Sequence, residues 1–100
     1  MSGGLSVEPL SYSAATLKKR LGADWEKLLR AAHRWMVLGR TLDTRMTALQ
    51  RQGRVGFYGP ATGQEAVNVA TGLATAPEDW ISPGLREQLV ALVRGHSLLA

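Results

Sequence analysis

Apolar residues recur along residues 24–50 at alternating steps of four and three, which is the spacing of one face of an α-helix. The positions in this stripe are Leu28, Ala32, Trp35, Gly39, Leu42, Met46 and Leu49. Asp24 precedes the stripe and is a candidate N-cap residue. The pattern therefore predicts a long helix from Asp24 to about Gln50 with one buried seam, in which Gly39 lets another backbone approach closely.

Residues 1–23 are predicted to form an irregular lead that contains one short helix. Gly3-Gly4 and Pro9 oppose regular structure at the start of the chain. Ser13 can cap a helix over residues 14–21, and Gly22 can close that helix in a left-handed conformation that glycine adopts at little cost. We therefore divide the chain into this lead, 1–23, and a helical segment over 24–100.

A third helix is predicted to begin within the glycine-rich stretch that follows the long helix. Thr62 and Glu65 have the spacing of a capping box, in which the threonine hydroxyl accepts from the Glu65 amide and the glutamate reaches back to the threonine amide. The helix should end before Pro77. The small and apolar residues expected on its buried face are Ala66, Val69, Ala70 and Leu73.

The last predicted helix follows a short extended piece at residues 79–81. Ser82 is its candidate cap, and Pro83 would occupy the first turn, where a missing amide costs nothing. Gly95 would end this helix. Three leucines, Leu85, Leu89 and Leu92, would then lie in line along it.

The composition agrees with a mainly α-helical globular segment. Of the 100 residues 45% are hydrophobic and 20% are charged, and the absence of cysteine excludes disulfides and thiolate metal sites. No apolar run approaches the roughly 20 residues of a membrane helix, so we expect no membrane association and a cytoplasmic location. His33 and His96 lack the spacing of a metal site, and no metal ligands are predicted in this chain.

A net charge of +4 raises the possibility of a nucleic-acid partner. The arginines are spread along the chain, and Lys18-Lys19-Arg20 is the only dense cluster. Aromatic residues of the stacking kind do not interleave with them. Solvated helix faces are therefore the favoured interpretation, and no nucleic-acid partner is expected.

Two places in the sequence are candidates for binding chemistry. In "GRVGFYGPATGQEA", residues 53–66, Phe57 and Tyr58 are either anchors in the core or the wall of an apolar pocket. Arg86 would lie in the first turn of the last predicted helix and could help to hold a phosphate there. Its alternative is a surface arginine paired with Glu87 or Asp79.

The order of these motifs resembles the amino-terminal region of the α subunit of the thiamine-diphosphate-dependent 2-oxoacid dehydrogenases. The resemblance covers about Leu28 to Gly95 and rests on Arg40, Asp43 and Arg45, on "QRQGRVGFYGPATGQEA", and on "PEDW" followed by a segment that contains Arg86. Where many members have tyrosine, histidine and glycine near this arginine, the chain has Leu85, Gln88 and Leu89.

The resemblance implies that the segment is the N-terminal helical part of an α/β thiamine-diphosphate-binding fold, truncated at residue 100. It implies an α2β2 enzyme with a β-subunit partner, which decarboxylates pyruvate or a branched-chain 2-oxoacid and passes the acyl group to a lipoyl acyltransferase core. Phe57 would line the substrate pocket and Arg86 would hold the cofactor diphosphate, whereas Gln64 and Glu65 would shape the turn and helix behind the pocket. The Mg ligands and the catalytic residues would lie outside these 100 residues, which alone should be inactive.

A second hypothesis is a stand-alone helical interaction module that derives from the same family and has lost catalysis. Leu89, where the family often has glycine, motivates it. Such a module would fold, co-purify with a partner and ignore thiamine diphosphate. A decarboxylase subunit would instead continue into a magnesium-diphosphate motif.

Overall fold

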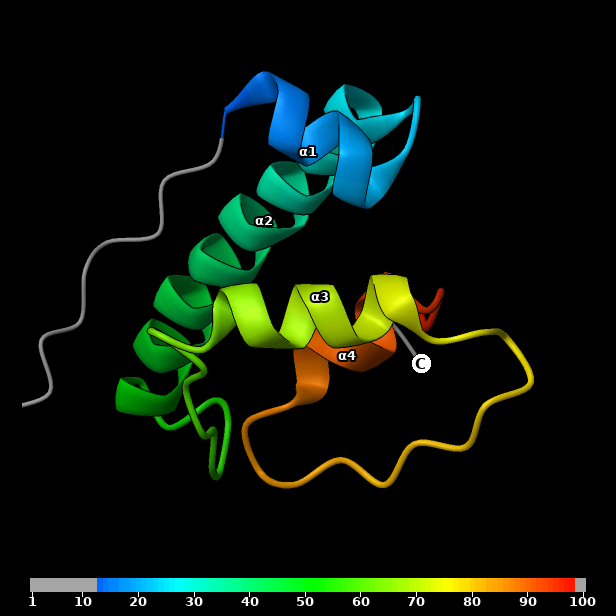
Figure 1. Ribbon diagram of the computed structural model, residues 1–100. Helices are drawn as coiled ribbons and strands as arrows, with labels where there is room; N and C mark the ends of the chain where they lie inside the picture. The colour runs from blue at the N-terminus through cyan, green and yellow to red at the C-terminus, as the bar shows by residue number, and fades with distance from the viewer. Residues whose placement is uncertain (1–12, 99–100) are drawn as a thin grey trace, which may run out of the picture.

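The computed structural model describes residues 13–98, and this part of the chain is built from helices and loops without a strand (Figure 1). The helices are α1 (Ala14–Leu21), α2 (Trp25–Arg51), α3 (Glu65–Ala74) and α4 (Gln88–Val93). None of them is long and apolar enough to cross a lipid bilayer. The prediction of a mainly helical segment is confirmed, whereas most of the irregular lead, residues 1–12, lies outside the described residues.

Helix α1 has the two ends that the sequence predicts. The Ser13 hydroxyl accepts a hydrogen bond from the Thr16 amide at 3.2 Å, which satisfies one of the free amides of the first turn. At the other end Gly22 has a φ of +91°, and its amide donates to the Lys18 carbonyl. No residue of α1 is buried, so the helix packs only lightly on α2.

Helix α2 confirms the long apolar stripe, because every residue of the stripe is buried or half-buried. Asp24 precedes the helix as predicted, but its side chain makes no capping hydrogen bond. At Gly39 a methyl group would lie 2.7 Å from Cδ2 of Leu89 in α4. The glycine therefore makes room for a leucine side chain, where the sequence suggested the approach of a backbone.

The core lies where α3 and α4 pack together against the middle of α2 (Figure 1). Its buried residues are Val69 of α3 and Leu89 and Leu92 of α4. The half-buried side chains that pack around them are Ala32, Trp35, Met36, Leu42 and Val93. The apolar core is therefore small and depends on close contact between α3 and α4.

The predicted buried face of α3 is wrong except for Val69. The buried residues are Glu65, Asn68, Val69 and Gly72, whereas Ala66, Ala70 and Leu73 are exposed. The helix turns this face inward because Glu65 and Asn68 find hydrogen-bond partners there. At Gly72 a Cβ would lie 2.8 Å from Cβ of Val93, so only glycine allows this approach of α4.

The last helix begins later than predicted. Ser82 does not cap it, since residues 82–87 are not helical and α4 starts at Gln88. The Arg86 carbonyl accepts from the Asn68 side chain at 2.9 Å, and the Val90 amide bonds to the Glu87 carbonyl. Leu85 therefore lies in the preceding loop with 62% of its surface exposed, out of line with the buried Leu89.

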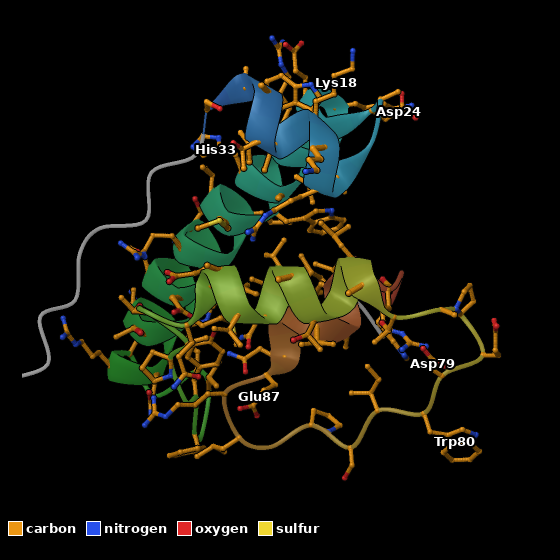
Figure 2. All side chains as sticks on the ribbon, in the orientation of Figure 1. Lys18, Asp24, His33, Asp79, Trp80 and Glu87 are labelled. Carbon is orange, nitrogen blue, oxygen red and sulfur yellow. The ribbon has the colours of Figure 1, made fainter. Side chains whose placement is uncertain are left out.

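A long loop connects α3 to α4 and runs away from the helices before it returns (Figure 1). Arg94, just after α4, donates to the carbonyls of Pro77 and Asp79 and to the Thr75 hydroxyl. These bonds tie the first half of the loop to the end of α4. Beyond them Trp80 is fully exposed and projects away from the helices (Figure 2).

Candidate functional site

The glycine-rich loop leaves α2 through a tight turn and enters α3 through another. Gly53 has a φ of +72°, and its amide donates to the Gln50 carbonyl as the helix ends. Gly63 has a φ of +93°, just before α3 begins at Glu65. Both positions need the left-handed region that glycine adopts readily. The residues between them carry the aromatic pair.

A buried carboxylate of α2 holds this loop. Asp43 is 3% exposed, and its two oxygens accept hydrogen bonds from the Tyr58 hydroxyl and, at 2.8 Å, from the Thr62 hydroxyl. Burial raises the pKa of Tyr58 to about 12, and the bond to Asp43 acts in the same direction. The phenol therefore stays protonated as a donor at neutral pH.

The predicted capping box between Thr62 and Glu65 is wrong, because both side chains bond elsewhere. The Thr62 hydroxyl donates to Asp43, and one oxygen of Glu65 accepts from the Gly63 amide at 2.8 Å. The other oxygen accepts from Nε of Arg40 on α2. Glu65 still supports the start of α3, but it does so through Gly63 and a distant arginine.

The ion pair between Arg40 and Glu65 joins a buried acid to a base that reaches solvent. Glu65 is 5% exposed, whereas the Arg40 side chain is 59% exposed. The hydrogen bond from Arg40 is the main cause that lowers the pKa of Glu65 to about 2, with the amide of Gly63 acting in the same direction. The pair raises the pKa of Arg40 in return.

The segment before α4 meets the glycine-rich loop directly. Nη1 of Arg86 donates to the Pro60 carbonyl, and Nε2 of Gln88 donates to the Gly59 carbonyl at 3.1 Å and to the Tyr58 hydroxyl at 3.0 Å. Leu85 packs against Gly59, where a Cβ would lie 3.1 Å from its Cγ. Residues 57–60 and residues 85–88, which are far apart in the sequence, thus lie side by side, and we call this region the edge of the molecule.

Phe57 and Tyr58 have different environments in the structure. Tyr58 is half-buried and hydrogen-bonded, so it is the anchor of the pair. Phe57 is 65% exposed, so it is no core anchor and remains available to line a pocket. Its predicted role in substrate binding stays a prediction.

Arg86 differs in two respects from the sequence-based expectation. It lies in a turn before α4, and the helix that follows has only six residues. Within residues 13–98 neither Glu87 nor Asp79 pairs with it, because its partner is the Pro60 carbonyl and the Asp79 carboxylate accepts from the Ala76 amide. The guanidinium of Arg86 is exposed beside the loop that carries Phe57.

Sequence reasoning gave no role to Asp43 or to the side chain of Gln88. A signal existed for Asp43, which follows the buried Gly39 at a spacing of four on α2 and so falls beside the apolar stripe. For Gln88 no local pattern was informative, since its partners lie some thirty residues earlier. Across the part of the chain that the structure describes, no three His, Asp or Glu side chains gather as metal ligands would.

Comparison with known proteins decides the family. The family model described as "Dehydrogenase E1 component" matches residues 33–100, more than half of the chain. The chain belongs to this E1 family. The matched region of the E1 chain begins within α2 and includes Arg40, Asp43, the glycine-rich loop and Arg86, so it contains every residue of the network described above.

Three curated relatives show how much of an E1 chain is present. The pyruvate dehydrogenase E1 component subunit alpha of Bacillus subtilis is 49% identical over 59 residues, which are 59% of this chain and 16% of the relative. The 3-methyl-2-oxobutanoate dehydrogenase subunit alpha of Mycobacterium tuberculosis is 44% identical over 70 residues, 70% of this chain and 19% of the relative. A Staphylococcus aureus pyruvate dehydrogenase E1 component subunit alpha is 52% identical over 52 residues, 52% of this chain and 14% of the relative.

The E1 chain thus spans less than a fifth of the length of these relatives. No solved structure matches it significantly. The sequence identity of the chain to α subunits of two kinds of 2-oxoacid dehydrogenase agrees with the family resemblance that its motifs carry.

Proposed function

We propose that this chain is the N-terminal part of the α subunit of a 2-oxoacid dehydrogenase. The complete enzyme decarboxylates pyruvate or a branched-chain 2-oxoacid with thiamine diphosphate and transfers the acyl group to a lipoyl group. Support comes from the family match and from relatives that are named as alpha subunits of pyruvate and 3-methyl-2-oxobutanoate dehydrogenases. Because these relatives cover both substrate classes, the proposal does not choose between them.

The observation that carries the proposal is a hydrogen bond between the two segments that hold the predicted site residues. Phe57 stands exposed in the glycine-rich loop, and Arg86 is bonded to the Pro60 carbonyl three residues further along the same loop. An exposed apolar ring and an exposed cation on two hydrogen-bonded segments suit a ligand with an apolar substrate end and an anionic cofactor end. Phe57 therefore lines the substrate pocket and Arg86 holds the diphosphate in this proposal.

The donors of this edge fit thiamine diphosphate in part. A guanidinium has five N–H donors, and the bond to Pro60 uses one of those on Arg86, so the group can still bind a diphosphate. The Leu85 side chain cannot donate, and Nε2 of Gln88 already donates to the Tyr58 hydroxyl and the Gly59 carbonyl. Thiamine diphosphate, when bound, supplies the electron sink that makes decarboxylation of a 2-oxoacid possible.

The other parts of the complete enzyme come from outside this chain. The proposal assigns the Mg ligands and catalytic groups to the remainder of the α subunit and to a β subunit in an α2β2 assembly. A lipoyl acyltransferase core is the partner that receives the acyl group, and the compartment is the cytoplasm. The proposal therefore requires no cluster of metal-ligating side chains within residues 13–98.

The test uses the enzyme assembled from the complete α subunit and its β partner. Arg86→Met should weaken thiamine diphosphate binding about 10- to 100-fold in isothermal titration calorimetry, the usual effect of removing a charge-assisted hydrogen bond. Phe57→Ala should raise KM for the 2-oxoacid and leave cofactor affinity unchanged. Arg30→Met, at an exposed arginine of α2, is the matched control.

Two outcomes would contradict the proposal. Cofactor affinity in Arg86→Met equal to that of the unsubstituted enzyme would remove Arg86 from the diphosphate site. An assembled protein that binds a partner but neither thiamine diphosphate nor a 2-oxoacid would instead favour the helical interaction module.

A further inference from the structure

Asp43 spans a short segment of the glycine-rich loop from one end to the other. Its Oδ1 accepts from the Tyr58 hydroxyl and its Oδ2 accepts from the Thr62 hydroxyl, so a single carboxylate holds both ends of residues 58–62. Asp43 itself is fixed on α2 and is 3% exposed. The carboxylate therefore determines where this segment lies relative to the long helix.

The residues between these two ends present their carbonyls to the first residue of α4 and to the turn before it. The Gly59 carbonyl accepts from Gln88, and the Pro60 carbonyl accepts from Nη1 of Arg86. Gln88 also donates to the Tyr58 hydroxyl, so the phenol links the acid of α2 to the start of α4. A chain of contacts runs from Asp43 through residues 58–62 to the Arg86 guanidinium.

We propose that Asp43 is a positioning residue, which fixes the Gly59 and Pro60 carbonyls through Tyr58 and Thr62 and thereby orients Arg86 for an anionic ligand. This inference rests on the proposed function in naming that ligand as the diphosphate of the cofactor. Asp43 does not touch the ligand, and its effect passes through the loop. Its loss therefore acts on cofactor affinity only while Arg86 is present.

The same contacts also fit a simpler role, in which Asp43 contributes to folding alone. Removing a partner from a buried hydrogen-bond network destabilises a protein wherever the network lies. A general loss of stability would weaken ligand binding whether or not Arg86 is present. The two roles therefore differ in whether the substitutions at Asp43 and Arg86 are additive.

A double-mutant cycle in the assembled enzyme separates them. Asp43→Asn should weaken thiamine diphosphate binding about 10- to 100-fold, the range found when groups that orient a binding residue are removed. In an Arg86→Met background the same substitution should change affinity by no more than about twofold, the scatter of independent effects. Thr62→Val removes one of the two bonds at a more exposed position and should give the same pattern with a smaller loss.

Hydrogen exchange of the enzyme without cofactor gives a second readout that needs no activity. Asp43→Asn should speed amide exchange in peptides that cover residues 53–64 and 85–88, and should leave α1 unchanged. Asp24→Asn is the matched control, because Asp24 lies at the start of the same helix and its side chain makes no capping bond. It should alter neither exchange nor cofactor affinity.

The possible results identify which proposal fails. Losses at Asp43 that are equal with and without Arg86, or unchanged exchange over residues 53–64, would overturn the positioning role and leave the cofactor role of Arg86 intact. Equal cofactor affinity in Arg86→Met and the unsubstituted enzyme would overturn the cofactor role, and the positioning role with it. If Asp43→Asn does not fold, Thr62→Val decides by the same cycle.

Discussion

Replacement of Gly72 by alanine tests whether α3 and α4 depend on a backbone contact that only glycine permits. The new Cβ would lie 2.7 Å from Cγ1 and 2.8 Å from Cβ of Val93, and 3.4 Å from the Val90 carbonyl oxygen. Ordinary contacts between carbon atoms are about 3.5–4.0 Å, so α4 would have to move away by about 1 Å. A rotamer change cannot relieve the clash, because Cβ of Val93 is fixed to its backbone.

The magnitude follows from two opposed effects. Alanine is favoured over glycine inside a helix by about 1 kcal/mol, while overpacking of a close contact costs about 1–3 kcal/mol. The displacement also loosens the packing of Val69 and Leu92, which belong to the small core. The two effects together leave a loss of about 0–2 kcal/mol in the free energy of unfolding, and the loosened packing moves the expected loss toward the upper end of that range.

Urea unfolding followed by far-ultraviolet circular dichroism measures this change. Ala70→Gly is the matched control, because Ala70 is exposed in the same helix and reports the cost of glycine without the contact. If helix propensity alone governed this helix, Gly72→Ala would stabilise by about the amount that Ala70→Gly destabilises, about 1 kcal/mol. A stabilised or unchanged Gly72→Ala protein would refute the close-contact argument.

Three further substitutions test the core, the ion pair and the long loop. Leu89→Ala should lower the free energy of unfolding by about 2–5 kcal/mol. The loss should be smaller in a Gly39→Ala background, because the added methyl group fills part of the space that Leu89 leaves. If the two substitutions have additive effects in urea unfolding, this explanation is contradicted. Because the pKa of Glu65 is lowered to about 2, its contribution to stability is present above the ordinary value of 4.5 and is lost as pH falls from there toward 2. Thermal unfolding should therefore show Glu65→Gln less stable than the unsubstituted protein at neutral pH, with a difference that shrinks below pH 4.5 and is nearly gone only at pH about 2, and a constant difference would count against the pair. Arg94→Met should speed hydrogen exchange in residues 75–80 without lowering the global unfolding energy to a similar degree, and unchanged exchange would show that the arginine does not hold the loop.

The helices that the sequence predicts best are those whose signals are local. The stripe of α2 has seven positions over about six turns at 3.6 residues per turn, so its length and buried side follow from periodicity alone. The Ser13 cap and the Gly22 stop of α1 likewise depend on residues within one turn of the helix ends. Tertiary contacts did not need to be known for either element.

The sequence-based predictions fail where a polar residue is buried because it hydrogen-bonds to a residue far away in the sequence. Hydrophobicity favoured Ala66, Ala70 and Leu73 as the inner face of α3, but the inner face contains Glu65 and Asn68. Glu65 is satisfied by Arg40 and Asn68 by the Arg86 carbonyl, and neither partner is visible in the local sequence. The helix start predicted at Ser82 was also wrong, and in this segment the Arg86 carbonyl accepts from the distant Asn68 side chain while α4 begins at Gln88.

The candidate site itself is organised by these same polar contacts. Family resemblance predicts Phe57 and Arg86 as site residues, whereas the contact between the segments that carry them depends on Asp43, Tyr58 and Gln88. A buried carboxylate or amide is costly unless its partners are in place, so the loops must adopt their positions for α2 and α3 to pack as they do. The hydrophobic pattern can therefore predict the helices of this segment but not the arrangement of its candidate site, because burial of Asp43, Glu65 and Asn68 makes the core and the loops depend on each other.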